Sequence, residues 1–424
     1  MRPIERRGRV TAIDVIRGIA LLGIVIENVR FIAMPVARAI QGPWSADGSR
    51  HDAIASFLGL VLGHYKFLGL FTMLFGFGLA AQRARLVASG VRSLPFELRR
   101  IGWLAVVGLF HGLGLFFGDI LFVFAGVALL ALPFLGRSTG VRLGLGICLV
   151  VLSGVLAARG PLQTWLDRPA DDASLVVDRP VPDSSEASTG GETRMTDPAS
   201  SPAGREFETR FRNWRSSIGY GVRFYGWYLL GLVLVGTTLR DVGFFESRHA
   251  DRRTRAALAC LAVGLPLEFV HFLPASLRGG DGFAAVAWAF LHPATAAAVV
   301  IGYAGLATTL VERRRFPLAR PLAALGRMSL SCYLLESMLL AAIFRPWGLD
   351  WFGGVGDATA TLIGTGVFVL VLLAGTIWSH WFLLGPFEWC WRWFTYLQRP
   401  PIRRIASPAG DGSVDLASRR SADD

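Results

Sequence analysis

The chain has 424 residues, of which 53% are hydrophobic and 17% charged, and its formal net charge is +12. Soluble domains carry roughly 25% charged residues, so this composition excludes an ordinary soluble protein. The basic excess gathers at the ends of apolar blocks, where membrane orientation signals belong, and no nucleic-acid-binding motif accompanies it, so no nucleic-acid partner is expected.

The apolar blocks predict an all-α fold, a polytopic helical bundle embedded in the lipid bilayer. A helix needs roughly 20 apolar residues to cross a bilayer, and about ten blocks approach that length. The expected spans are residues 12–33, 66–82, 101–117, 119–135, 141–158, 218–239, 255–274, 283–310, 322–344 and 358–384. Residues 52–63 are expected to form an extra interfacial or re-entrant segment.

The placement of arginines predicts that both termini are cytoplasmic. If the basic N-terminal segment lies inside, the connections after the even-numbered spans also fall inside, and they read "QRARLVASGVRSLPFELRR", "GRSTGVR", "RDVGFFESRHADRRTR" and "VERRRFPLAR". The short turn at Gly118 and Asp119, on the other side, has no basic residue. Every short loop therefore agrees with the rule that basic residues stay inside.

A polar segment, residues 160–217, divides the chain into two halves. It is rich in Asp, Ser, Pro and Thr and cannot bury enough apolar surface to fold alone, so we expect a disordered extracytoplasmic loop. Residues 205–216 could instead form an interfacial helix. The expected units are thus a five-span half, 1–159, a five-span half, 218–406, and a disordered tail, 407–424.

The first span carries ionisable residues, which are costly inside a membrane and are candidates for function. Asp14 and Arg17 are three residues apart and share a helix face, so they can form a structural ion pair. Arg17 could alternatively bind an anionic donor near the inner face. Glu27 and Asn28 end the same span on the outer side.

A histidine, His111, lies in the apolar stretch "LAVVGLFHGLGLFFGDILF", and Asp119 follows at the outer turn. His64 and Lys66 are expected at the same outer level, so one leaflet could collect a set that suits general base catalysis or proton coupling. A packed, hydrogen-bonded histidine is the structural alternative for His111. Lys66, the only lysine, could be a snorkelling anchor at a helix end.

A second polar set is expected on the inner side. Span nine begins "LGRMSLSCYLLES", with Arg327 and Glu336, and the last span leads into "GPFEWCWRWFTY", whose aromatic residues fit an interface belt. The four cysteines are widely separated and form no CxxC pair, and no metal-binding motif is present, so we expect neither a disulfide framework nor a metal site.

Several stretches in order resemble the YeiB-like family of bacterial membrane proteins: "DVIRGIALLGIVIENV", "KFLGLFTMLFGFGLAAQ", "RRIGWLAVVGLFHGLGLFFGDILFVFA", "GRMSLSCYLLES" and "GPFEWCWRWFTY". The order and spacing cover nearly the whole chain except the 160–215 loop. This resemblance implies a multi-pass protein of the bacterial inner, cytoplasmic membrane.

A wider resemblance links the first span to membrane acyltransferases, through the pattern Arg17-Gly18-Ile19-Ala20. In the acyltransferase-3 family that arginine is followed by an essential histidine, at the position where this chain has Asn28. An amide cannot act as a general base. Either the base lies elsewhere, with His111 and His64 as candidates, or the chain is not an acyltransferase.

The resemblance implies transmembrane acyl transfer as the leading hypothesis. A cytoplasmic acyl-CoA would be the co-substrate, held near Arg17 and Arg327, and no cofactor would be bound permanently. His111 would act as general base or transient acyl carrier towards a small-molecule or glycan hydroxyl acceptor, oriented by Asp119. The remaining candidates for substrate binding are Glu27, Asn28, His64, Lys66 and Glu336.

Two other functions stay open. A proton-coupled transporter would use Glu27, His111 and Asp119 as coupling sites. A non-catalytic membrane partner would need none of them. The sequence names neither donor nor acceptor, and it does not specify the oligomeric state.

Overall fold

The structure is a computed structural model, and it describes residues 11–44, 48–167, 202–280 and 282–403. The described part is helical, and no strand lies within it beyond one isolated bridge between Phe382 and Arg403. The α-helices are α1 (Thr11–Ala33), α2 (Val36–Ile40), α3 (Arg50–Leu62), α4 (Lys66–Ala88), α5 (Leu94–Gly114), α6 (Leu121–Ala131), α7 (Thr139–Leu166), α8 (Pro202–Tyr220), α9 (Gly226–Asp241), α10 (Ala250–His271), α11 (Phe283–Glu312), α12 (Ala319–Arg327), α13 (Ser329–Phe344), α14 (Asp357–Trp381) and α15 (Pro386–Tyr396). The prediction of an all-α fold is confirmed.

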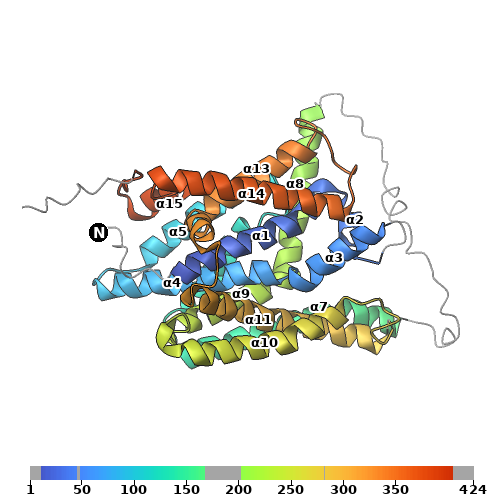
Figure 1. Ribbon diagram of the computed structural model, residues 1–424, viewed down its shortest axis with the longest axis horizontal. Coiled ribbons are helices and arrows are strands. Elements are labelled where there is room, and N and C mark those ends of the chain that lie inside the picture. The colour runs from blue at the N-terminus through green and yellow to red at the C-terminus, as the bar shows by residue number, and fades with distance from the viewer. Residues whose placement is uncertain (1–10, 45–47, 168–201, 281, 404–424) are drawn as a thin grey trace, which may run out of the picture.

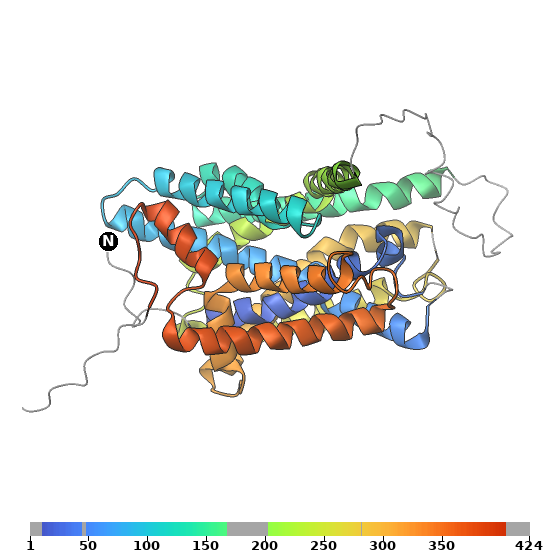
Figure 2. The same ribbon diagram turned by 90° about the horizontal axis from the view of Figure 1, so that it is seen from above.

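Most of the helices lie side by side along the long axis of the molecule, with α1 and α4 in the middle (Figure 1). α13 and α14 lie on one side of them, and α10 and α11 on the other. α8 runs across the others and is seen nearly end-on in the turned view (Figure 2). The arrangement is a bundle that α8 crosses near one end.

Six helices of the described part are long and apolar enough to cross a membrane, or seven if the bent pair α12 and α13 is one span. α1 and α5 lack such an uninterrupted apolar stretch because charged residues such as Asp14, Arg17, Glu97 and Arg100 fall within them. The structure therefore supports a membrane protein with several spans, and the full number of ten stays a prediction.

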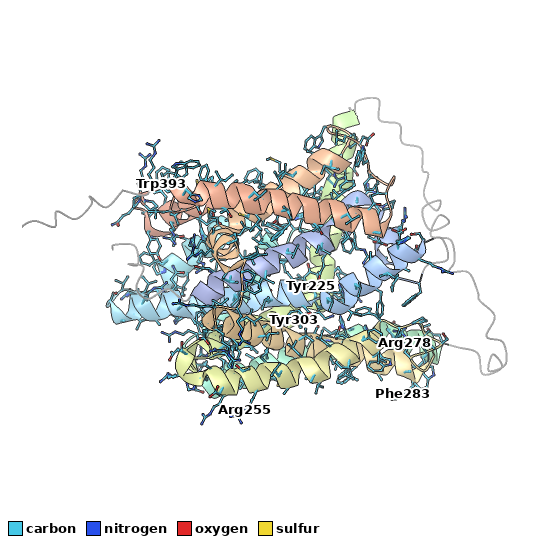
Figure 3. All side chains as sticks on the ribbon, viewed as in Figure 1. Tyr225, Arg255, Arg278, Phe283, Tyr303 and Trp393 are labelled. Atoms are coloured by element: carbon cyan, nitrogen blue, oxygen red, sulfur yellow. The ribbon has the colours of Figure 1, made fainter. Side chains whose placement is uncertain are left out.

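The two ends of the bundle carry different connections. Trp393 of α15 lies at the end where α1 begins, and Arg278 and Phe283, around the α10–α11 connection, lie at the opposite end (Figure 3). The orientation prediction requires these segments to lie on opposite sides of the membrane. Which end faces the cytoplasm stays a prediction; we call the end with the start of α1 the inner end and the other the outer end.

Close helix packing in the bundle rests on glycine. A Cβ on Gly326 of α12 would meet the backbone carbonyl of Asp14 of α1, and one on Gly236 of α9 would meet the backbone of Met73 of α4. Small residues of this kind let membrane helices approach each other closely, which is where their packing energy comes from. α1, α4, α9 and α12 therefore form a tightly packed centre.

The segment expected as a separate piece, residues 52–63, is instead helix α3, which joins α4 in one candidate span with a break between them. Tyr65 in the break has φ +66°, a left-handed conformation that is rare outside glycine. Side chains satisfy three carbonyl groups there: Lys66 Nζ donates to Leu60 at 3.0 Å, Tyr303 Oη to Leu62 at 3.1 Å and Tyr228 Oη to Tyr65 at 3.0 Å. Irregular backbone in a membrane requires partners of this kind.

Two further expectations need correction. The span expected over 322–344 is not one straight helix, because α12 and α13 meet at 90° around Met328. The polar segment 160–217 is also narrower than expected, because α7 continues to Leu166 and α8 begins at Pro202. α8 agrees with the alternative of a helix at 205–216. The expectations for residues 168–201 and for 404–424 fall outside the described residues.

Candidate functional site

The first candidate site is a pair formed by His111 of α5 and Asp119 of the turn before α6. Nδ1 of His111 lies 2.7 Å from Oδ1 of Asp119, and the two residues are 3% and 0% exposed. Oδ2 of Asp119 accepts the backbone N–H of Phe122 at 2.7 Å, in the first turn of α6. Because one carboxylate oxygen is held by the helix and the other faces the imidazole, the aspartate fixes the orientation of the ring.

This geometry decides which nitrogen of His111 is available. A carboxylate only accepts hydrogen bonds, so Nδ1 carries the hydrogen in the neutral ring and Nε2 keeps its lone pair. Nε2 is buried and has no hydrogen-bond partner among the described residues. A histidine held in this way by an aspartate can take a proton at Nε2.

An inner cavity of about 140 Å³ leads towards this pair. Its wall includes Tyr333 of α13, whose ring centroid lies 4.9 Å from that of His111. Its polar lining consists of four arginines, one carboxylate and Ser329, and its remaining wall is largely apolar and aromatic. The arginines are Arg17, Arg100, Arg327 and Arg392.

The one carboxylate of the inner cavity, Glu388 of α15, is engaged by the start of α13. It accepts the N–H groups of Leu330 and Ser331 at 2.7 and 3.1 Å and the hydroxyl of Ser331 at 2.5 Å. Burial raises the pKa of Glu388, and these hydrogen bonds partly offset the rise. The lining of the cavity therefore holds four guanidinium groups and one carboxyl group.

The arginines are also held in place by protein groups. Arg100 donates to Oε1 of Gln82 at 2.6 Å and lies over the ring of Trp391, 4.6 Å from its centroid. Arg17 forms an ion pair with Asp14 at 3.8 Å. The structural pair expected for Asp14 and Arg17 is therefore present, and Arg17 and Arg327 do line one cavity, as the expectation of a common donor site requires.

Lys66 belongs to a second, separate cluster. It is 0% exposed, and its ammonium group forms an ion pair with Glu268 of α10. Glu268 is also fully buried and accepts hydrogen bonds from Nδ1 of His292, at 3.1 Å, and from the hydroxyl of Thr295, both on α11. A buried ammonium does not snorkel, so Lys66 is not an interface anchor.

Three imidazole rings stack beside this ion pair. His292 lies between His64, at 5.6 Å between ring centroids, and His271, at 4.6 Å, and the rings are within 5° of parallel. Within the described part of the chain, no group of three or more His, Cys, Asp or Glu residues is placed to hold a metal ion. The cluster is thus an ion pair and a histidine stack at the break between α3 and α4.

The remaining predicted site residues are distributed as follows. Glu27 packs against Gly63, so it lies beside the Lys66 cluster rather than beside His111. Asn28 is half-buried and makes no hydrogen bond to the described residues. Glu336 of α13 is 2% exposed, and neither carboxyl oxygen has a hydrogen-bond partner in the described chain. The polar set expected in one leaflet is therefore divided between two clusters.

Sequence reasoning missed Glu268 and His292. A signal existed for both, because each is an ionisable residue within an apolar run, "LAVGLPLEFVHF" and "AFLHPATAAAVV". Nothing in the sequence paired them with Lys66, since that pairing depends on how α4 packs against α10 and α11.

Comparison with known proteins identifies relatives of this chain, but none of them has an assigned activity. Residues 240–398 match the family described as "Protein of unknown function (DUF418)". The chain is 28% identical to "Uncharacterized protein YeiB" of Escherichia coli (strain K12) over 418 residues, which are 95% of this chain and 98% of that protein. It is 24% identical to "Uncharacterized protein YxaH" of Bacillus subtilis (strain 168), with the same shares covered.

A third relative is the "Uncharacterized 39.9 kDa protein in amylase 3'region" of Bacillus acidopullulyticus, which is 24% identical over 410 residues. No solved structure matches the chain. These matches do not extend to the membrane acyltransferases. The resemblance of this chain to the YeiB-like proteins of DUF418 is confirmed, and it covers nearly the whole chain.

Proposed function

We propose that the chain is a membrane acyltransferase that moves an acyl group from acyl-CoA at the inner end to a hydroxyl acceptor at the outer end. The observation that carries the proposal is the pair of His111 and Asp119, with Nε2 of the histidine buried and without a partner in the described chain. A buried base with an available lone pair is what the activation of a hydroxyl group requires.

The inner cavity supports an anionic donor. CoA carries phosphate groups, and arginine binds phosphate through paired, charge-assisted hydrogen bonds. A cavity of about 140 Å³ is too small for the whole of CoA, so it would receive the acyl end, with the nucleotide beyond its inner mouth. Arg17 and Arg327 would hold the anionic part, and Tyr333 marks where the acyl group would meet His111.

In the proposed step, His111 acts as the general base. Nε2 of His111 accepts the proton of the acceptor hydroxyl as its oxygen bonds to the thioester carbonyl carbon. The carbon–sulfur bond then breaks, and the CoA thiolate leaves and takes up that proton. In the variant with a transient carrier, Nε2 bonds to the thioester carbonyl carbon and the CoA thiolate leaves. The acceptor hydroxyl then attacks that carbon, the carbon–nitrogen bond breaks, and the hydroxyl proton passes to the CoA thiolate. Asp119 stabilises the imidazolium in the first route and the orientation of the ring in both.

Lys66, Glu27 and His64 would then act indirectly, through their packing, and would not touch the substrate. The ion pair between Lys66 and Glu268 ties the break between α3 and α4 to α10, so we assign Lys66 a positioning role. Asn28 and Glu336 stay candidates for contact with the substrate.

A proton-coupled transporter is the second candidate, and a different observation favours it. Lys66, Glu268 and His292 form a buried titratable network at a helix break, with Glu27 packed nearby. Networks of this kind often serve proton coupling in transporters.

The test is acyl-CoA turnover by the purified protein in nanodiscs, using acetyl-CoA and a long-chain acyl-CoA. We expect thiol release that His111→Asn and Asp119→Asn reduce by about 10²-fold or more, in keeping with the loss of a general base. His51→Asn, a change of an exposed histidine of α3, is the matched control and should have no effect. Absence of turnover, together with uptake of a substrate driven by a proton gradient in proteoliposomes, would favour the transporter.

A further inference from the structure

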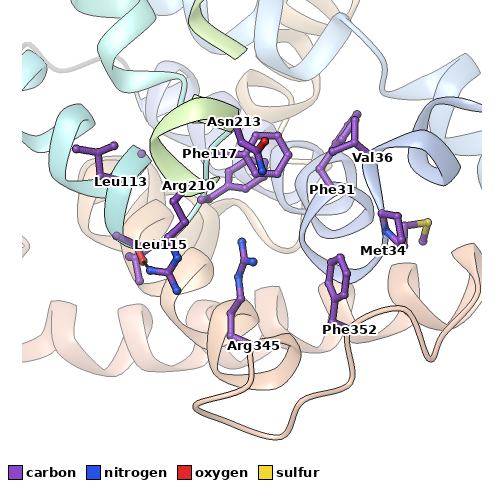
Figure 4. A pocket seen from close by; sticks show the side chains of 14 residues that line it. Phe31, Met34, Val36, Leu113, Leu115, Phe117, Arg210, Asn213, Arg345 and Phe352 are labelled. Carbon is purple, nitrogen blue, oxygen red and sulfur yellow. Dashed lines mark hydrogen bonds between the residues drawn. The ribbon is translucent and has the colours of Figure 1, made fainter. Parts of the chain in front are cut away.

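A second cavity, of about 300 Å³, lies at the outer end of the bundle (Figure 4). Four parts of the chain line it: the end of α1 with the start of α2, the α5–α6 turn, α8, and the end of α13 with the loop that follows. It shares no lining residue with the inner cavity. It is therefore a separate space.

The outer cavity adjoins the histidine of the proposed reaction. Gly112, the neighbour of His111, lines it, as does Phe116, whose ring centroid lies 6.5 Å from that of His111. Tyr333 contacts the same histidine from the inner cavity. His111 thus lies between the two cavities. The ring of Phe116 separates it from the outer cavity, and the ring of Tyr333 separates it from the inner cavity.

The polar lining of the outer cavity is cationic. Arg210 of α8 and Arg345 at the end of α13 both line it, and their guanidinium groups point into the same space (Figure 4). The amide of Asn213 lies one helical turn after Arg210, and no acidic side chain occurs among the described residues of the lining. Arg210 also donates to the carbonyl of Gly114 at 3.3 Å, which ties its guanidinium to the α5–α6 turn.

The rest of the wall is apolar and aromatic. Phe31, Met34 and Val36 lie on one side, and Phe117 and Phe352 also line the space (Figure 4). A ligand that fits this wall has an anionic group beside an apolar or ring-shaped part.

α8 is attached directly to the turn that carries the catalytic pair. Trp214 is 9% exposed, and a Cβ on Gly112 would meet its indole ring. Its ring also lies edge-on to Phe122, at 5.2 Å between centroids, and the N–H of Phe122 is the one that holds Asp119. A group bound between Arg210 and Arg345 would thus have a fixed position relative to His111 and Asp119.

We propose that the outer cavity binds a phosphate group of the acyl acceptor between Arg210 and Arg345. Guanidinium groups on two helices that point into one cavity can bind different oxygens of one phosphate group through charge-assisted hydrogen bonds. The source is either a lipid headgroup or a water-soluble phosphate ester. The word "acceptor" rests on the proposed function; the phosphate site itself does not.

The test measures binding without any acyl transfer. The full chain in phosphatidylcholine nanodiscs is titrated with glycerol 3-phosphate, and separately its retention of phosphatidic acid over phosphatidylcholine is measured by native mass spectrometry. We expect at least one probe to bind. Arg210→Gln and Arg345→Gln should each weaken that binding by about tenfold or more, which is the scale of one lost charge-assisted hydrogen bond. Arg345→Lys should weaken it less.

Arg212→Gln is the matched control. Arg212 lies on the same helix but is 66% exposed and pairs with Glu208, and it does not line the cavity. Glycerol 3-phosphate binding alone would indicate a soluble ester, and selective retention of phosphatidic acid would indicate a lipid. Binding by neither probe, or binding unchanged in folded Arg210→Gln and Arg345→Gln proteins, would overturn the proposal.

The two proposals fail in different ways. If the arginine variants lose phosphate binding but no acyl-CoA turnover is found with the wild type, the phosphate site stands and acyl transfer does not. If turnover depends on His111 while phosphate binding is absent or insensitive to Arg210 and Arg345, acyl transfer stands and the phosphate site is wrong.

Discussion

Lys66 shows how burial changes the meaning of a residue. At the end of an apolar run, a lone lysine fits an anchor that reaches the membrane surface. In the structure its ammonium is 0% exposed and pairs with Glu268, which also holds His292 and Thr295. The side chain therefore ties the irregular α3–α4 break to α10 and α11, and its loss would leave a buried carboxylate uncompensated.

We predict that Lys66→Met lowers the free energy of unfolding by about 3–5 kcal/mol, the usual cost of breaking a buried pair from one side. The double change Lys66→Met with Glu268→Leu should recover much of this loss, because no isolated charge remains. Thermal unfolding of the purified protein measures both. Arg85→Met, at an exposed position of the same helix, is the control. Equal stability of Lys66→Met and wild type would contradict the buried pair.

Glu336 should behave in the opposite way. Its carboxyl group is buried without a hydrogen-bond partner in the described chain, and such a group costs about 1–3 kcal/mol. We therefore expect Glu336→Met to raise the melting temperature of the protein. A clear fall in stability would mean that the carboxyl group has a stabilising contact.

At the scale of elements, α8 brings residues that line the outer cavity next to the α5–α6 turn, close to His111 and Asp119. The contact between Trp214 and Gly112 permits this placement, and a methyl group at Gly112 would meet the indole ring. The same helix contributes Arg210 and Asn213 to the outer cavity. Displacing α8 should therefore affect turnover through the outer cavity, and a Cβ on Gly112 would also lie 3.3 Å from Cβ of Asp119.

We predict that Gly112→Ala lowers acyl-CoA turnover by about tenfold or more, since small misplacements of a site cost that much or more. The matched change is Gly126→Ala in α6, where an added Cβ meets nothing within 4 Å. That variant should turn over acyl-CoA like the wild type and be slightly more stable, because alanine favours helix over glycine. Equal activity of both variants would argue against a role for the packing of α8 and Asp119 around Gly112.

The elements also show what the sequence could and could not predict. The short Gly118-Asp119 turn brings the chain straight back after α5, so the proximity of His111 and Asp119 is a local matter, and the observed 2.7 Å contact agrees with it. The partner of Lys66 is 202 residues away and depends on helix packing, which no local pattern encodes. The bend at Met328 has no proline signal and is set by the packing of α12 against α1.

At the scale of the whole molecule, transfer across the membrane requires two cavities that open to opposite sides of the membrane with His111 between them. Four arginines line the inner cavity and two line the outer cavity, so an anionic group would meet guanidinium groups in either. His111 itself lines neither cavity, so the rings of Tyr333 and Phe116 must move for the two substrates to reach Nε2. The orientation of the bundle decides which side supplies the acyl donor.

Cysteine labelling tests that orientation. In a background without Cys148, Cys260, Cys332 and Cys390, we expect Ser276→Cys, in the α10–α11 connection, to react with an impermeant maleimide in intact spheroplasts. Ser89→Cys, after α4, should react only once the membrane is opened. Both positions are exposed, so access through the protein does not limit either reaction. The reverse pattern would place the four-arginine cavity outside and remove the cytoplasmic donor from the account.

Transfer across the membrane is the central claim, and sealed inverted vesicles measure it most directly. The vesicles come from a deletion strain of a bacterium that carries this chain, complemented with wild type, His111→Asn or His51→Asn. Acyl-CoA labelled in its acyl group is added outside, at the exposed cytoplasmic face. We predict a covalently labelled product inside the vesicles for wild type and His51→Asn, and none for His111→Asn. Label that stays outside with the wild type, or equal labelling inside with His111→Asn, would contradict the account.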